Sequence, residues 1–175
     1  MAFRRLATLL ASALIASAAL AADTTALSPE VQAGLETARR LGIDAPTTPP
    51  IIYVDSVAEH YTHDEQILLA WRGGDGRWRL AGGIETTGLM VKMNPDHQVR
   101  PLATLSRADS LTLDRLLADR RLYRQASPAA PALGIGAAFN ILEVVAPQGH
   151  LVIRWAGMRL RGRAGRIADI LMGHD

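Results

Sequence analysis

The chain has no cysteine, a single lysine and few aromatic side chains, which make up 5% of its 175 residues. The absence of cysteine excludes disulfide bonds, thiol catalysis, thiolate metal sites and attachment of a lipid to an N-terminal cysteine. The length suits one ordinary globular domain and excludes a large multidomain enzyme. Apolar residues make up 49% of the chain, so a hydrophobic core can form without covalent cross-links.

The first residues have the pattern of a secretory signal peptide. Arg4 and Arg5 precede an uncharged, largely apolar run over residues 6–20, and the small residues Ala21 and Ala22 follow. This run of about 15 residues is shorter than the roughly 20 that a membrane-spanning helix needs. We therefore expect cleavage after Ala21 and a periplasmic or secreted protein with no transmembrane segment in its mature chain.

Loss of the leader makes the expected mature chain, residues 22–175, electrically neutral. Arg4 and Arg5 leave with residues 1–21, so that 17 basic residues remain against 17 acidic residues. A neutral chain lacks the basic excess of nucleic-acid-binding domains, and we expect no nucleic-acid partner. We expect one domain, because the proline-containing linker over residues 126–131 is too short to separate two.

Signals for helices and strands alternate along the mature chain. Ser28 has the side chain needed to cap a helix that starts at Pro29, and Ser106 or Ser110 can cap another. The predicted helices cover residues 29–41, a segment that ends near residue 125, and residues 164–171, while a capping-box pattern over residues 56–59 predicts a further short helix. The predicted strands cover residues 51–54, 67–71, 77–80, 88–93, 141–146, 151–155 and 158–161. Glycine-containing turns at residues 73–76 and 147–150 predict two hairpins, one from the second and third of these strands and one from the fifth and sixth.

These elements predict the α+β class, as a single domain in which two or three helices pack on a mainly antiparallel sheet of about five to seven strands. The order of the strands stays open, because spacing along the chain does not determine which strands pair. Trp71, Trp78 and Trp155 fall in predicted strands, where aromatic side chains usually pack in the core. We expect all three to contribute to the core, with stacking on sugars as the alternative.

The densest polar cluster in the sequence runs from Glu59 to Glu65. His60 and His63 would share one face of a helix, and Asp64 or Glu65 would add a carboxylate, so these four residues are candidate zinc ligands. Water bound to zinc at such a site would be the nucleophile of a metal-dependent hydrolase. The residue order differs from the His-Glu-x-x-His pattern of zinc proteases, and a solvated surface loop is the simpler interpretation.

Charge is distributed unevenly along the mature chain. Residues 41–71 contain five acidic residues and no lysine or arginine, whereas residues 144–168 contain five arginines and no acidic residue. Arg159 and Arg161 alternate with apolar residues, which predicts a strand with both guanidinium groups on one face. Such groups bind phosphates, carboxylates and acidic protein surfaces, while pairing with the acidic segment and a solvated face are the alternatives. The candidate residues for binding a ligand or partner are Arg154, Arg159, Arg161, Arg163 and Arg166.

No catalytic motif covers enough of the chain to identify a reaction or its residues. We therefore interpret the chain as a small exported, non-enzymatic binding module, such as an inhibitor, an immunity protein or an envelope adaptor. Its expected partner is a protein or an anionic component of the envelope, and this interpretation requires no cofactor. The alternative is a metal-dependent hydrolase that uses zinc bound by His60, His63 and either Asp64 or Glu65. The oligomeric state stays open.

Overall fold

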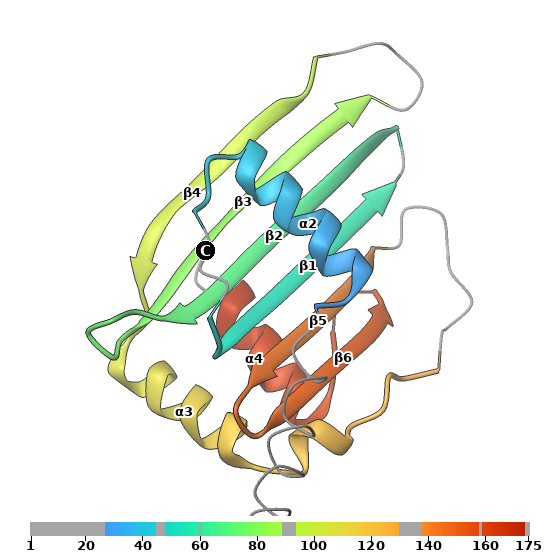
Figure 1. The fold of residues 1–175 in the computed structure, drawn as a ribbon. Helices are drawn as coiled ribbons and strands as arrows, with labels where there is room; N and C mark the ends of the chain where they lie inside the picture. The colour runs from blue at the N-terminus through green and yellow to red at the C-terminus, as the bar shows by residue number, and fades with distance from the viewer. Residues whose placement is uncertain are drawn as a thin grey trace, which may run out of the picture.

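The computed structural model describes residues 27–44, 48–59, 61–88, 94–129, 138–157 and 159–173. These residues form a six-stranded antiparallel sheet with helices on both faces (Figure 1). The elements are α2 (Pro29–Arg40), β1 (Ile51–Glu59), β2 (Thr62–Arg72), β3 (Trp78–Gly88), β4 (Asp96–Thr104), α3 (Arg107–Ala118), the 3-10 turn η1 (Leu122–Arg124), β5 (Phe139–Ala146), β6 (Gly149–Ala156) and α4 (Gly162–Met172). This architecture confirms the predicted α+β class and single domain.

The strands lie in the order β4-β3-β2-β1-β5-β6, and every neighbouring pair is antiparallel. Strands β1 to β4 follow one another as a meander, whereas β5 pairs with the other side of β1 after the chain has passed through α3. The predicted hairpins are both confirmed. Leu69 lies opposite Ala81 in the first, and Val144 lies opposite Leu151 in the second.

Serine side chains fix the starts of two helices. Ser28 Oγ accepts a hydrogen bond from the backbone N–H of Val31 at 3.3 Å, which confirms the predicted start of α2. Ser106, and not Ser110, caps α3 by accepting from the backbone N–H of Asp109 at 3.1 Å. No helix in the described part of the chain combines the length and the apolar character needed to cross a membrane.

Two local predictions are wrong, each because of its surroundings in the fold. Residues 56–59, predicted as the start of a helix, are the last residues of β1 and pair with β2. Residues 159–161, predicted as a strand, lie outside the sheet, because β6 ends at Ala156 and Gly157 turns the chain with a φ of 81°. Most of the predicted strand over residues 88–93 lies outside the described residues, and only Gly88 is seen, at the end of β3.

Each face of the sheet has its own apolar core. On one face, α3 and α4 pack against strand residues that include Leu68 and Trp78. On the other face, which we call the α2 face, α2 packs against residues that include Leu69 (Figure 1). Trp78 and Trp155 belong to the first core, which confirms the prediction for both, and Trp71 packs at the border of the second.

Strand pairing places several polar residues of the α2 face in one row. Glu65 of β2 lies opposite Glu85 of β3, and Glu85 lies opposite His97 of β4. Because side chains alternate between the faces of a sheet, His63 shares the α2 face with Glu65, whereas Asp64 points to the opposite face. The row therefore crosses three strands beside the C-terminal half of α2.

Candidate functional site

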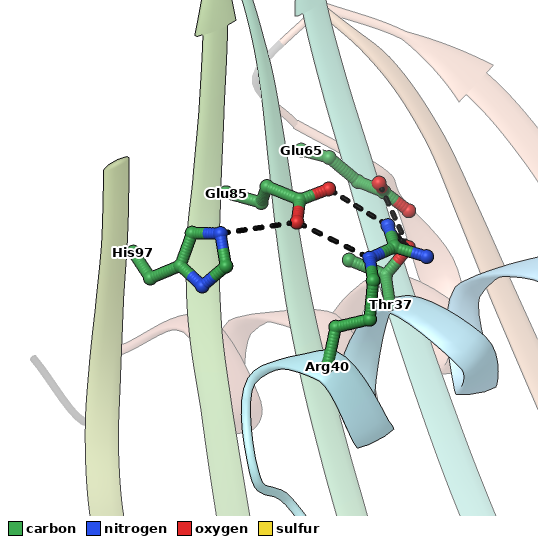
Figure 2. Close-up of polar contacts among 5 residues, drawn as sticks. All are labelled: Thr37, Arg40, Glu65, Glu85 and His97. Carbon is green, nitrogen blue, oxygen red and sulfur yellow. Dashed lines mark hydrogen bonds and ion pairs between the residues drawn. The ribbon is translucent and has the colours of Figure 1, made fainter. Parts of the chain in front are cut away.

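Helix α2 and three strands together form a polar cluster, shown in Figure 2. We call it the α2 polar cluster, and it comprises Thr37, Arg40, Glu65, Glu85 and His97. Thr37 and Arg40 lie on one side of α2, because residues three positions apart share a helix face. The strands supply the other three residues at directly opposed positions, so the cluster joins one helix to β2, β3 and β4.

Arg40 is the centre of the α2 polar cluster. Its Nη2 donates to Glu85 Oε2 at 2.7 Å and to Thr37 Oγ1 at 2.8 Å, and its Nε donates to Glu85 Oε1 at 3.3 Å. The Thr37 hydroxyl donates in turn to Glu65 Oε2 at 3.2 Å, and His97 Nε2 lies 3.3 Å from Glu85 Oε1. The bidentate pair between Arg40 and Glu85 fixes the end of α2 against the sheet.

The two glutamates of the α2 polar cluster have pKa values shifted in opposite directions. The hydrogen bond from Arg40 is the main cause that lowers the pKa of Glu85. Burial is the main cause that raises the pKa of Glu65, and the hydrogen bond from Thr37 partly offsets it. Glu85 is thus held as a carboxylate by a cation. Glu65, one of the predicted zinc ligands, is instead a hydrogen-bond acceptor under α2.

Two further polar side chains, Tyr53 and Asp55 of β1, are buried on the α2 face. Tyr53 is 1% exposed and Asp55 is 7% exposed, and neither the Tyr53 hydroxyl nor Asp55 Oδ1 has a hydrogen-bond partner among the described residues. The hydroxyl lies against Gly34 of α2, where an added Cβ would be 1.5 Å from its oxygen. Burial, followed by the charge of Glu65, raises the pKa of Asp55 to about 7.

The N-terminal end of α2 is held by a buried carboxylate. Glu143 of β5 is 1% exposed, and its two oxygens accept from the backbone N–H of Ser28, the N-cap residue, at 3.1 and 3.2 Å. His150 Nε2 of β6 lies 2.8 Å from the same carboxylate. A negative group at this end also interacts favourably with the helix dipole. Polar contacts therefore tie α2 to the sheet at both of its ends.

The predicted zinc ligands do not converge in the part of the chain that the structure describes. His63 and Asp64 lie on β2 and not on a helix, so they point to opposite faces of the sheet. His63 Nδ1 lies 3.2 Å from Glu59 Oε1, and Asp64 Oδ2 accepts from the Thr62 hydroxyl. His60 lies outside the described residues, and within them no group of three or more His, Asp or Glu side chains is placed to hold a metal ion. The predicted helix that would align the imidazoles is wrong.

The five arginines of the basic segment lie in different environments. Arg154 is exposed on the edge strand β6, and Arg163 of α4 pairs with Asp119, its Nε 2.5 Å from Asp119 Oδ2. Asp119 follows α3, so this pairing does not involve the acidic segment over residues 41–71. The other three are exposed and form no side-chain hydrogen bond or ion pair with any described residue: Arg159, Arg161 and Arg166.

Sequence reasoning missed the residues that hold α2. Thr37 and Arg40 belong to an ordinary amphipathic helix, and Glu143 lies in an apolar strand, so no local motif marks them. The only sequence signal is a charged residue inside an apolar strand, which requires a partner when it is buried. Comparison with known proteins adds no further residue, since no protein-family model and no curated protein sequence matches the chain.

Proposed function

We propose that the protein is a small exported binding module without enzymatic activity, which contacts a protein or an anionic component of the envelope through arginines at the start of α4. The observation that carries the proposal is the group of exposed arginines, Arg159, Arg161 and Arg166, which have no acidic partner among the described residues. Guanidinium groups without an intramolecular partner are available to bind carboxylates and phosphates.

The surroundings of these arginines favour an anionic partner. Residues 144–168 contain no acidic residue. Arg161 is the N-cap residue of α4, where the helix dipole adds to the positive potential. The backbone N–H of Ala164 donates to Gln125 Oε1 at 3.1 Å, so part of this helix end is already satisfied within the chain. The side chains of the arginines are therefore the expected points of contact.

Export is part of the proposal and is supported by the pattern of residues 1–21. The full chain, expressed in a Gram-negative host, is expected to appear in the periplasm with a mass that corresponds to cleavage after Ala21. Full-length protein confined to the cytoplasm would contradict export.

The binding proposal is tested by capture from an envelope extract with three tagged proteins. The first is the wild type, and the second replaces Arg159, Arg161 and Arg166 together by glutamine. The third is a control with the same change in net charge, in which three other exposed arginines on and after α3 are replaced by glutamine. These control positions are Arg107, Arg115 and Arg120.

We expect one partner to be retained by the wild type and the control at low salt, released at high salt, and lost from the first triple variant. Release by salt is expected because exposed charge pairs are screened. Circular dichroism verifies that all three proteins are folded. Equal retention by all three proteins, or retention of nothing by the wild type, would show that these arginines do not form the binding surface.

A further inference from the structure

Helix α2 covers an apolar strip of the sheet that also contains buried carboxyl groups. Ile51, Ile67, Leu69 and Ala81 form the strip together with Tyr53, and each of them is at most 7% exposed. An apolar interface tolerates a buried charge only when a cation or hydrogen-bond donors compensate it. The docking of α2 must therefore depend on the charge state of any uncompensated acid beneath it.

We propose that α2 is a pH-controlled cover of the sheet, which stays docked while Asp55 is protonated and opens when Asp55 becomes charged. Asp55 is 7% exposed, and its Oδ1 has no hydrogen-bond partner among the described residues. The residue opposite Asp55 on β2 is the apolar Ile67, and Glu65, two positions away on the same face, is a second acid. Ionisation of Asp55 thus places a buried charge near a like charge.

The groups around Asp55 compensate this charge only in part, because the Tyr53 hydroxyl, His63 and the Ser56 backbone N–H favour the carboxylate less than burial and the charge of Glu65 oppose it. Arg40, the arginine that α2 places over this side of the sheet, donates to Glu85 through both Nε and Nη2. His63 lies 3.2 Å from Glu59. The titratable groups that surround this part of the interface are Tyr53 from β1, His63 and Glu65 from β2, Glu85 from β3, His97 from β4, Glu143 from β5, His150 from β6, and Glu36 and Arg40 from α2.

The direction of the pH dependence follows from linkage. The pKa of Asp55 is about 7 with α2 docked, and opening lets it return toward the ordinary value of 3.8. Between these values the open state binds fewer protons, so the opening equilibrium rises with pH, by up to tenfold per pH unit. From about pH 5 to about pH 8, the expected increase is on the order of 100-fold. The raised pKa of Glu65 acts in the same direction.

Glu85 has the opposite dependence, because its pKa is lowered by Arg40. The tie between Glu85 and Arg40 is lost only when the pH falls through the lowered pKa of Glu85. Titration of this contact therefore does not contribute to opening in the range in which Asp55 titrates. The proposal concerns opening on the alkaline side, and it predicts that the apolar sheet surface is uncovered more often above neutrality than at mildly acidic pH.

The absence of cysteine allows a direct test by thiol labelling. Ala38→Cys places a thiol on the sheet-facing side of α2, and Ala164→Cys places one on the sheet-facing side of α4, on the opposite face of the sheet. Both alanines are 0% exposed. Each protein is treated with N-ethylmaleimide between pH 5 and pH 8, and each labelling rate is divided by the rate of the urea-unfolded protein at the same pH. This normalisation removes the pH dependence of the thiol itself, and the α4 thiol reports global unfolding.

We expect the normalised rate of Ala38→Cys to rise on the order of 100-fold across this range and to exceed that of Ala164→Cys at every pH. The rate of Ala164→Cys rises by a similar factor, because global unfolding also frees Asp55, but it starts from a lower value. In an Asp55→Asn background, the rise at position 38 should be lost. A flat profile at position 38, equal normalised rates at both positions, or an unchanged rise with Asp55→Asn would each overturn the proposal. Amide-exchange protection of α2 relative to α4 in the wild type gives the same comparison if the Ala38→Cys protein does not fold.

Discussion

Replacing Asp55 by asparagine should make the free energy of unfolding less dependent on pH. The folded protein holds the proton of Asp55 with a pKa of about 7, against an ordinary value of 3.8. Stability that depends on this proton is present below about pH 4 and is lost as the pH rises to about 7. The gap between the two pKa values corresponds to about 4 kcal/mol. Asparagine has nearly the same shape but cannot ionise, so the variant lacks this loss.

The assay is urea unfolding followed by tryptophan fluorescence at several pH values from 4 to 8, on the wild type, Asp55→Asn and a control, Asp96→Asn. Asp96 is an exposed carboxyl on the edge strand β4. The wild type and the control should lose about 4 kcal/mol more than Asp55→Asn between the ends of the range. Any constant cost of burying the asparagine amide cancels in this comparison. Parallel curves for all three proteins would refute the assignment of a titrating carboxyl beneath α2.

Three further substitutions test the contacts that hold the fold together, each measured by urea unfolding at neutral pH. Gly34→Ala should destabilise the protein by roughly 1–3 kcal/mol, because the new Cβ would lie 1.5 Å from the Tyr53 hydroxyl oxygen. This loss outweighs the better helix propensity of alanine. Unchanged stability would mean that α2 does not pack this closely on β1. Glu143→Gln should cost about 1–3 kcal/mol, because the negative charge and one of the two oxygens that accept from the Ser28 N–H are lost. A variant as stable as the wild type would show that this contact does not hold α2. Asn140→Ala should also cost about 1–3 kcal/mol, because the buried Asn140 side-chain amide donates to the Gly157 carbonyl oxygen at 2.8 Å. A loss of stability too small to measure would show that this hydrogen bond contributes little.

Local signals predicted the elements whose structure is determined by nearby residues. The serine cap of α2 and the glycine-rich turn after β2 act within a few residues, and both are found where the sequence indicates them. The capping-box pattern over residues 56–59 failed because the same residues complete a strand that pairs with β2. A helix cap contributes about 1 kcal/mol, which is less than a ladder of backbone hydrogen bonds and the burial of β1.

The alternation of Arg159 and Arg161 with apolar residues led to the wrong prediction of a strand over residues 158–161. Leu160 is 6% exposed and packs in the core between α4 and the sheet, so a buried residue between two exposed ones arises here without a strand. Gly157 directs the chain away from β6 before this segment begins. A pattern only three residues long therefore identifies the buried side chain but not the backbone conformation.

The row of Glu65, Glu85 and His97 could not be predicted, because it depends on the register of three strands. Each residue is separated from the next by a turn or a connection whose length does not determine the pairing. The position of α2 over this row adds Thr37 and Arg40, and nothing near these residues in the sequence indicates which strands they contact. The sequence therefore predicts most helices and strands and the class of the fold. The polar contacts under α2 could be identified only once the pairing of the strands was known.

Photo-crosslinking in growing cells is the decisive test of whether the arginines at the start of α4 contact a partner. A photoreactive amino acid replaces Arg161 in one strain and the exposed Arg120 after α3 in another, and the adducts are separated and identified by mass spectrometry. We expect an adduct with one partner from position 161 and none from position 120. No adduct from position 161, or the same adducts from both positions, would contradict it.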